Sequence, residues 1–204
     1  MIYFGDRDVV SKLAACGFLP WLPELLGVAA NEIEIRYLVS LRSSLSRPNK
    51  KLSNKQFQQH LVEFCEAHSI IDGVSNVARL EELLHSGMDP GESMLFAEAE
   101  ETHGTVVTGD KRALAAYAGL SNAIQRGKIR VVCWEQLLLR VHQIKGYEAL
   151  RAGCCEGIEC DKLLSLAFSN GLATQEEHAL DAIRSYLNDL KKGAADFLFT
   201  FDPA

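Results

Sequence analysis

The stretch MIYFGDRDVVSKLAACGFL at residues 1–19 decides the fold of this chain. Its first five residues are apolar enough for a short buried strand, and an apolar run typical of a helix begins at Val9. Two carboxylates, Asp6 and Asp8, lie between them at the carboxyl end of the strand. In open α/β sheets, ligands and metals bind at this edge. The sequence therefore predicts an α/β fold with a polar site after its first strand.

Two further carboxylates stand at the ends of predicted elements. The motif DPGE at residues 89–92 is a strong helix start, with an aspartate cap, a proline at the first helical position and Glu92 in the first turn. Asp110 directly follows the apolar strand within THGTVVTGD, residues 102–110. Hard divalent cations prefer oxygen ligands, so these acids and Asp6 together predict a metal site.

The rest of the chain alternates short strands with longer helices. This alternation predicts a small parallel sheet flanked by helices. Residues 1–146 are expected to form this α/β domain, and residues 147–204 an acidic, mainly helical C-terminal extension. The apolar stretch at 197–201 reads either as an edge strand or as a packed terminus. Predicted strands cover 1–5, 105–108 and 129–133; predicted helices cover 9–16, 21–26, 31–45, 74–85, 90–103, 110–117 and 135–144, and another follows the capping pair of Ser53 and Gln56.

Length and composition fit one domain, or one domain with an appendage. Of the 204 residues, 48% are hydrophobic, which is enough for a core. No apolar run approaches the roughly 20 residues that cross a bilayer, and no signal-peptide pattern begins the chain. The cysteine pattern favours reduced thiols, and a cytoplasmic location is expected. The spacing of Cys154, Cys155 and Cys160 lacks the paired knuckles of a structural zinc site.

The formal net charge of −6 argues against a nucleic-acid partner, but the charges are unevenly distributed. Residues 147–204 carry ten acidic and five basic side chains. Residues 36–55 carry six basic side chains and residues 111–130 carry five, with no acidic one in either stretch. These two basic stretches either bind phosphates or form a solvated loop and helix face.

The ordered motifs resemble those of PIN-domain nucleases over about residues 1–135. The D-x-D after the first strand, the segment DPGESMLFAEAE and the segment TGDKRA follow one another as the acids of that family do. The resemblance implies a phosphodiesterase that depends on Mg²⁺ or Mn²⁺ and cuts RNA with water as the nucleophile. Many such nucleases act as the toxin of a toxin–antitoxin pair.

The resemblance also implies roles for individual residues. Asp6 matches the first acid of the family, Glu92 matches the acid of its GE motif, and Asp110 matches the acid after the next strand. These three residues would hold the metal. Thr108 matches a hydroxyl that stands just before the last acid, where it would orient a carboxylate or water.

Two positions match supporting acids. Asp8 takes the place of an Asn or Asp two residues after the first acid. A further acid normally lies in the helix that follows, where Glu34 is the best candidate and Glu32 the next. Asp8 and Glu34 would support the metal ligands or bind a second metal. The segment GVAANEIEIRYL departs from the family pattern, and metal binding is weakened if neither glutamate points inward.

The extension lies outside the resemblance. It is a lid, a dimer arm that joins two copies of the chain, or a surface for a protein partner such as an antitoxin. RNA is the expected substrate, guided by basic residues between Arg36 and Lys55, and no membrane partner is expected.

Three other interpretations remain open. Asp89 and Asp110 could serve only as helix caps, a role worth about 1 kcal/mol, and Asp6 or Asp8 only as the start of a helix. A PIN-like fold without catalysis could bind nucleic acid or protein. The stretch DRDVV also resembles the first motif of haloacid-dehalogenase-type phosphatases, but no further Asp follows the G-D pair at residues 109–110 as that family requires.

Overall fold

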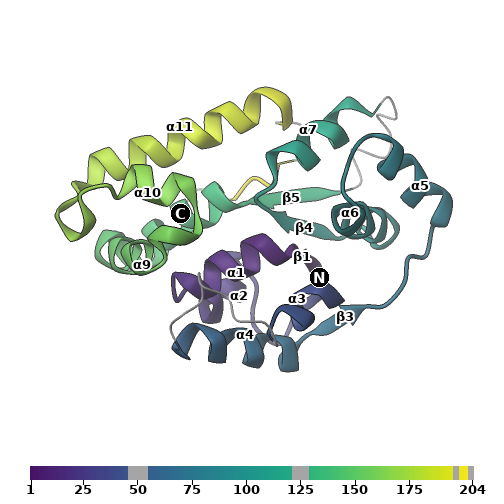
Figure 1. Ribbon diagram of the computed structural model, residues 1–204, viewed down its shortest axis with the longest axis horizontal. Coiled ribbons are helices and arrows are strands. Elements are labelled where there is room, and N and C mark those ends of the chain that lie inside the picture. The colour runs from purple at the N-terminus through teal and green to yellow at the C-terminus, as the bar shows by residue number, and fades with distance from the viewer. Residues whose placement is uncertain (46–54, 121–128, 195–197, 202–204) are drawn as a thin grey trace.

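Five parallel strands form one sheet at the centre of the molecule (Figure 1). The computed structural model describes residues 1–45, 55–120, 129–194 and 198–201. Strand β1 is the middle strand of the order β3-β2-β1-β4-β5, and it pairs in parallel with both β2 and β4. The strands are β1 (Ile2–Gly5), β2 (Glu34–Leu38), β3 (Ser69–Ile71), β4 (Thr105–Thr108) and β5 (Arg130–Cys133).

Helices cover both faces of the sheet, and further helices form the extension (Figure 1). The predicted class, a small parallel sheet flanked by helices with a helical extension, is confirmed. In the part of the chain that the structure describes, no helix combines the length and apolar character needed to cross a membrane. The helices are α1 (Arg7–Ala15), α2 (Leu22–Leu25), α3 (Val39–Ser44), α4 (Lys55–Ala67), α5 (Val77–His85), α6 (Pro90–Thr102), α7 (Lys111–Gly119), α9 (Trp134–Glu156), α10 (Lys162–Ala167) and α11 (Glu176–Ala194), with short 3₁₀ turns at η1 (Leu19–Trp21), η3 (Ile158–Cys160) and η4 (Gly171–Ala173).

Successive residues of each strand point to opposite faces of the sheet, and both faces are buried. Tyr3 and Val107 belong to a core that side chains of α1, α4 and α9 complete. Phe4 and Val106, their neighbours in the chain, belong to a second core with side chains of α6 and α7. The short, apolar character of β1 and β4 follows from this burial on both sides.

Residues 31–45, predicted as a helix, instead contain strand β2 and the short helix α3. The buried Ile35 and Tyr37 alternate with the less buried Glu34 and Arg36, which is the period of two of a strand. The helix prediction was wrong because this alternation takes precedence over helical spacing. Strand β3 is not predicted, since three residues are too few to show a periodicity. Ser53, of the predicted capping pair, lies outside the described residues.

The extension shares a core with the α/β part of the chain. Helix α9 spans the predicted boundary between residues 146 and 147 and is interrupted at Gly146, where φ is 83°. Leu150 of α9, Leu164 of α10 and Ile183 of α11 belong to the same core as Leu13 of α1. The expected boundary thus falls at a break in a helix, while the packing on its two sides is continuous.

Glycines let the extension approach the end of α1 closely. A Cβ atom at Gly153 would lie 2.3 Å from Cε1 of Phe18 and 2.4 Å from the carbonyl oxygen of Cys16. A Cβ atom at Gly157, one turn later, would lie 2.5 Å from Sγ of Cys16. These separations are far shorter than van der Waals contact, so only glycine fits at either position in this packing.

The last described segment, residues 198–201, lies along β5. Leu198 forms a single parallel bridge with Val131, and the backbone N–H of Phe199 donates to the carbonyl oxygen of Val131 over 2.7 Å. The side-chain amide of Gln136 donates to the carbonyl oxygen of Phe199 over 2.6 Å. Of the two predicted alternatives, the segment is a packed terminus with one bridge to the sheet edge.

We expect Gly153→Ala to lower the free energy of unfolding by roughly 1–3 kcal/mol, because the added methyl group overpacks the contact with Phe18 and Cys16. Chemical denaturation monitored by circular dichroism measures this change. Gly193→Ala in α11 is the matched control, because nothing lies within 4 Å of a Cβ there. An equal effect of the two substitutions would contradict the close approach of α9 to α1.

Candidate metal centre

The three carboxylates predicted to hold a metal meet at the carboxyl edge of the sheet. Asp6 follows β1, Asp110 follows β4, and Glu92 lies in the first turn of α6. Because β1 and β4 are adjacent and parallel, their carboxyl ends lie side by side. All three residues line one open cavity of about 610 Å³. The fold thus brings together residues that are far apart in the sequence.

Asp89 and Asp110 each cap a helix and also line the cavity. A side-chain oxygen of Asp110 accepts the backbone N–H groups of Arg112 and Ala113 over 2.7 and 3.2 Å. A side-chain oxygen of Asp89 accepts the N–H of Glu92 over 3.0 Å. Both aspartates are therefore helix caps, as the cap interpretation expects. Both also line the cavity, which a cap does not need to do.

Thr108 connects two of the acids. Its hydroxyl donates to a carboxylate oxygen of Asp6 over 3.5 Å and accepts the backbone N–H of Asp110 over 3.1 Å. The residue is fully buried at the end of β4. Thr108 therefore occupies the place predicted for a hydroxyl that orients a carboxylate.

Burial and mutual repulsion raise the pKa of two of the acids. The pKa of Asp6 is raised to about 6, first by burial and then by the negative charges of Asp8, Asp89 and Asp110. The pKa of Glu92 is raised to about 8, first by burial and then by Asp110, Asp89 and Asp6. Asp6 and Glu92 resist ionisation because they are buried and because other carboxylates are close, so a cation in the cavity would relieve the repulsion.

The donor groups of the cavity fit a hard divalent cation. The polar atoms that Asp6, Asp89, Glu92 and Asp110 offer are carboxylate oxygens, the ligands that Mg²⁺ and Mn²⁺ prefer. Among the described residues, no three histidine, cysteine or acidic side chains already stand in a metal-binding arrangement. The carboxylates would have to turn toward a cation on binding.

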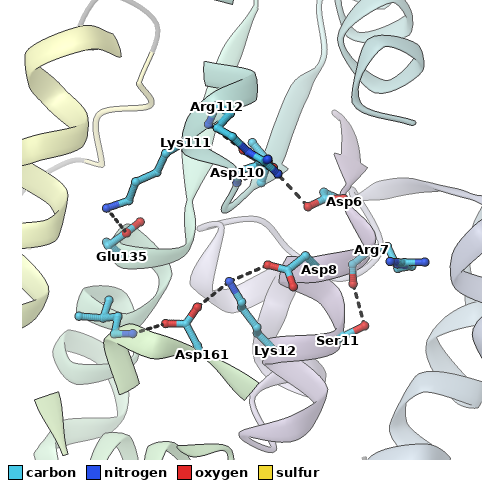
Figure 2. A network of polar contacts seen from close by, with 12 residues as sticks. Asp6, Arg7, Asp8, Ser11, Lys12, Asp110, Lys111, Arg112, Glu135 and Asp161 are labelled. Carbon is cyan, nitrogen blue, oxygen red and sulfur yellow. Dashed lines mark hydrogen bonds and ion pairs between the residues drawn. The ribbon is translucent and has the colours of Figure 1, made fainter. Parts of the chain in front are cut away.

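Asp8 is engaged by a buried lysine (Figure 2). The ammonium of Lys12 lies 2.6 Å from a carboxylate oxygen of Asp8 and 2.7 Å from a carboxylate oxygen of Asp161. Asp161 belongs to the extension, where it caps α10. Asp8 thus lies at the rim of the cavity, and its carboxylate is ion-paired.

The structure does not bring Glu34 to the site. Glu34 is the first residue of β2 and stands opposite Ile2 in the register with β1, which places it at the amino edge of the sheet. Its exposed carboxylate pairs with Arg36 over 2.7 Å. Glu32, the second candidate, is also exposed, in the turn before β2. The prediction of an inward glutamate here was wrong because the segment is a strand that runs toward the site from the opposite edge.

Two further acidic residues, not singled out from the sequence as site residues, lie in the cavity or contact a residue that lines it. Asp89, read only as a cap, lines the cavity. Glu135 follows β5 in the first turn of α9 and is 3% exposed, with one oxygen that has no hydrogen-bond partner in the described residues. Its other oxygen lies 3.6 Å from the ammonium of Lys111, which also lies 4.3 Å from the ring centre of Tyr186. The signal for Glu135 was its place in the first helical turn after a strand.

Basic side chains line part of the cavity. Arg7, Lys111 and Arg112 are among its lining residues, and the Arg112 side chain is 94% exposed. Much of the two predicted basic stretches lies outside the described residues: Arg47, Lys50, Lys51, Arg126 and Lys128. The described cations nearest the acids therefore come from α1 and α7.

We expect Glu92→Gln to stabilise the metal-free protein at pH 8 by about 1 kcal/mol or more, because the amide removes a charge that burial and its neighbours oppose. The folded protein keeps the Glu92 proton up to about pH 8, whereas the unfolded chain loses it near pH 4.5, so this residue's contribution to stability declines as pH rises between these values. Thermal unfolding in chelator at pH 5 and pH 8 measures the effect.

The exposed Glu81→Gln on α5 is the matched control and should leave the melting temperature unchanged at both pH values. Adding Mn²⁺ should raise the melting temperature of the parent more than that of Glu92→Gln, because the amide is a weaker ligand. A lower melting temperature of Glu92→Gln in chelator at pH 8 would contradict this account of the charges.

Comparisons with known proteins give little for this chain. No family model matches it, and no curated protein matches it. Among solved structures, the crystal structure of PAE2754 from Pyrobaculum aerophilum is similar, with 18% sequence identity and a TM-score of 0.39; the match covers 57% of this chain and 87% of that one. A likeness of this strength carries no argument about the site, whose interpretation depends on the residues described above.

Proposed function

We propose that this chain is a metal-dependent ribonuclease of the PIN-domain type. The observation that carries the proposal is the convergence of Asp6, Glu92 and Asp110 on one cavity at the carboxyl edge of a parallel sheet. Helix capping alone explains Asp110. It gives no reason for Glu92 to face the same cavity, although burial raises the pKa of this residue. A shared cation gives that reason.

The side chains that line the cavity would have two roles, to bind the cation and to keep a ligand in place. Asp6, Glu92 and Asp110 would hold Mg²⁺ or Mn²⁺ through carboxylate oxygens, and Thr108 would keep Asp6 in place. When bound, such a cation lowers the pKa of a water molecule and offsets charge that builds on phosphate oxygens.

RNA is the proposed substrate, and its phosphates would meet basic groups at the rim. Arg112 is exposed beside Asp110, and Arg7 and Lys111 line the same cavity. Guanidinium and ammonium groups bind phosphate oxygens through charge-assisted hydrogen bonds. The formal net charge of −6 provides no overall attraction for RNA, so binding would depend on local cationic groups such as these. We also propose a cytoplasmic location, where the free cysteines would stay reduced.

A nucleic-acid-binding or protein-binding module without catalysis is the second candidate. One observation favours it: Glu34, the candidate for a further acid, stands at the opposite edge of the sheet. A toxin role with an antitoxin on the extension, or a dimer of this chain, is a further proposal within the nuclease hypothesis. The phosphatase alternative would need Asp8 as a free general acid, which its ion pair with Lys12 opposes.

We expect Asp6→Asn/Asp110→Asn to reduce cleavage of a mixed RNA pool in Mn²⁺ by roughly 100-fold or more, since metal assistance supplies several kcal/mol of transition-state stabilisation. Asparagine keeps the cap that Asp110 provides to α7, so the fold should persist. Chelator should abolish cleavage by the parent, and added Mg²⁺ or Mn²⁺ should restore it.

The double variant Glu177→Gln/Asp181→Asn, near the start of α11, is the matched control, because it removes two exposed carboxylates that do not line the cavity. It should cleave RNA at the parental rate. Parental cleavage by Asp6→Asn/Asp110→Asn would refute the nuclease proposal. Retention of RNA on the parent without any cleavage would support the binding module.

A further inference from the structure

Lys12 is an unusual residue for the buried face of α1. It is 8% exposed, and its ammonium is held between Asp8 and Asp161 at 2.6 and 2.7 Å. Burial opposes the charged form, but the two carboxylates outweigh it and raise the pKa of Lys12 above its usual range. An isolated buried ammonium is costly, so the lysine depends on both partners.

The ammonium of Lys12 also lies close to the backbone that carries Asp110. A Cβ atom on Gly109, the residue before Asp110, would stand 3.5 Å from Nζ of Lys12 and 3.9 Å from a carboxylate oxygen of Asp8. A Cβ atom at this position would therefore be in ordinary van der Waals contact with the ion pair. Lys12 and Asp8 together occupy the space beside the loop that leads from β4 into α7.

Asp161 is itself fixed in the extension. Its Oδ1 accepts the backbone N–H of Leu163 over 2.8 Å and caps α10, while Oδ2 faces Lys12. Leu163 and Leu164 of α10 are buried in the core that includes α1. The carboxylate of Asp161 therefore cannot move independently of the packed extension. Figure 2 shows Asp8 and Asp161 on opposite sides of the Lys12 ammonium.

We infer that Asp8, Lys12 and Asp161 form a bridge through which the C-terminal extension completes the acidic site. In this bridge Lys12 and Asp161 are positioning residues: Asp161 holds Lys12, and Lys12 holds Asp8 at the rim of the cavity. The inference rests on the proposed function, and it gives the extension a role that the α/β part alone cannot supply.

The bridge accounts for the exposures of its members. The Asp8 side chain is 58% exposed, whereas those of Lys12 and Asp161 are 10% and 14% exposed. A solvated ion pair of Asp8 with a surface lysine would contribute little and hold no fixed geometry. Here Asp161 holds the lysine on its buried side. The lysine in turn holds the carboxylate of Asp8 at the cavity. The bridge also places one positive charge against the negative charges of the site.

The test compares Asp161→Asn, Lys12→Met and the double variant Lys12→Met/Asp161→Asn in the full chain. Asparagine preserves the cap on α10, and the double variant leaves the net charge unchanged while it removes the bridge. Mn²⁺ affinity is measured by titration calorimetry, and kcat and KM are measured for RNA cleavage. Circular dichroism and melting temperature report on folding.

We expect Mn²⁺ binding to weaken several-fold in Asp161→Asn, to tighten several-fold in Lys12→Met and to stay within about twofold of the parent in the double variant, following the local charge. We expect kcat to fall by roughly 10-fold to 100-fold in all three, with KM within about twofold, because Asp8 is no longer held. Lys12→Arg, which keeps the charge, should retain more of kcat than Lys12→Met does.

Parental kcat in a folded double variant would overturn the inference and leave the nuclease proposal intact. If buried Lys12 prevents Asp161→Asn from folding, the double variant, which contains no such unpaired charge, decides the question. A parent that binds Mn²⁺ but does not cleave RNA refutes the proposed function alone. Opposed changes in the Mn²⁺ affinity of the two single variants then support an effect of the bridge on the site. A parent that binds no Mn²⁺ overturns both.

Discussion

The parallel pairing of β1 with β4 is the constraint on which the site depends. In this pairing Gly5 stands opposite Val107, so Asp6 emerges beside Thr108. The backbone N–H of Asp6 donates to the carbonyl oxygen of Val107 over 2.9 Å, which extends the pairing to the acid itself. Burial of β1 and β4 on both faces gives the strands little freedom to shift in register, because a slip of one residue would exchange their two buried faces.

The acidic cavity conflicts with the stability of the fold that builds it. Burial and neighbouring charges raise the pKa of Asp6 to about 6 and that of Glu92 to about 8. Such crowding costs stability, and it is common where groups bind a cation or act in catalysis. Asp110 escapes the conflict: burial acts against its charge, but the backbone N–H groups of Arg112 and Ala113 lower its pKa.

The extension is joined to the α/β part by packing and by charge. Gly153 and Gly157 allow α9 to approach the end of α1 more closely than any larger residue would permit. A few residues away, Asp161 contacts Lys12 of the same helix α1. Tyr186 of α11 lies against the ammonium of Lys111, beside the acid that begins α7. Two of these contacts, those of Asp161 and Tyr186, reach residues next to the acidic cavity, whereas the glycines pack against the far end of α1.

The sequence by itself determined the α/β class, the helix start at residues 89–92 and the strand-end positions of Asp6 and Asp110. These features depend on local signals: short apolar runs, capping residues and the residues that directly follow a strand. The local signal was misread in one stretch, where Ile35 and Tyr37 alternate with period two. Only the tertiary structure decided that Glu34 lies at the amino edge of the sheet, that Asp89 joins the cavity and that Asp161 reaches Lys12. Strand order and helix packing bring these residues together or keep them apart, and no periodicity within a single element carries that information.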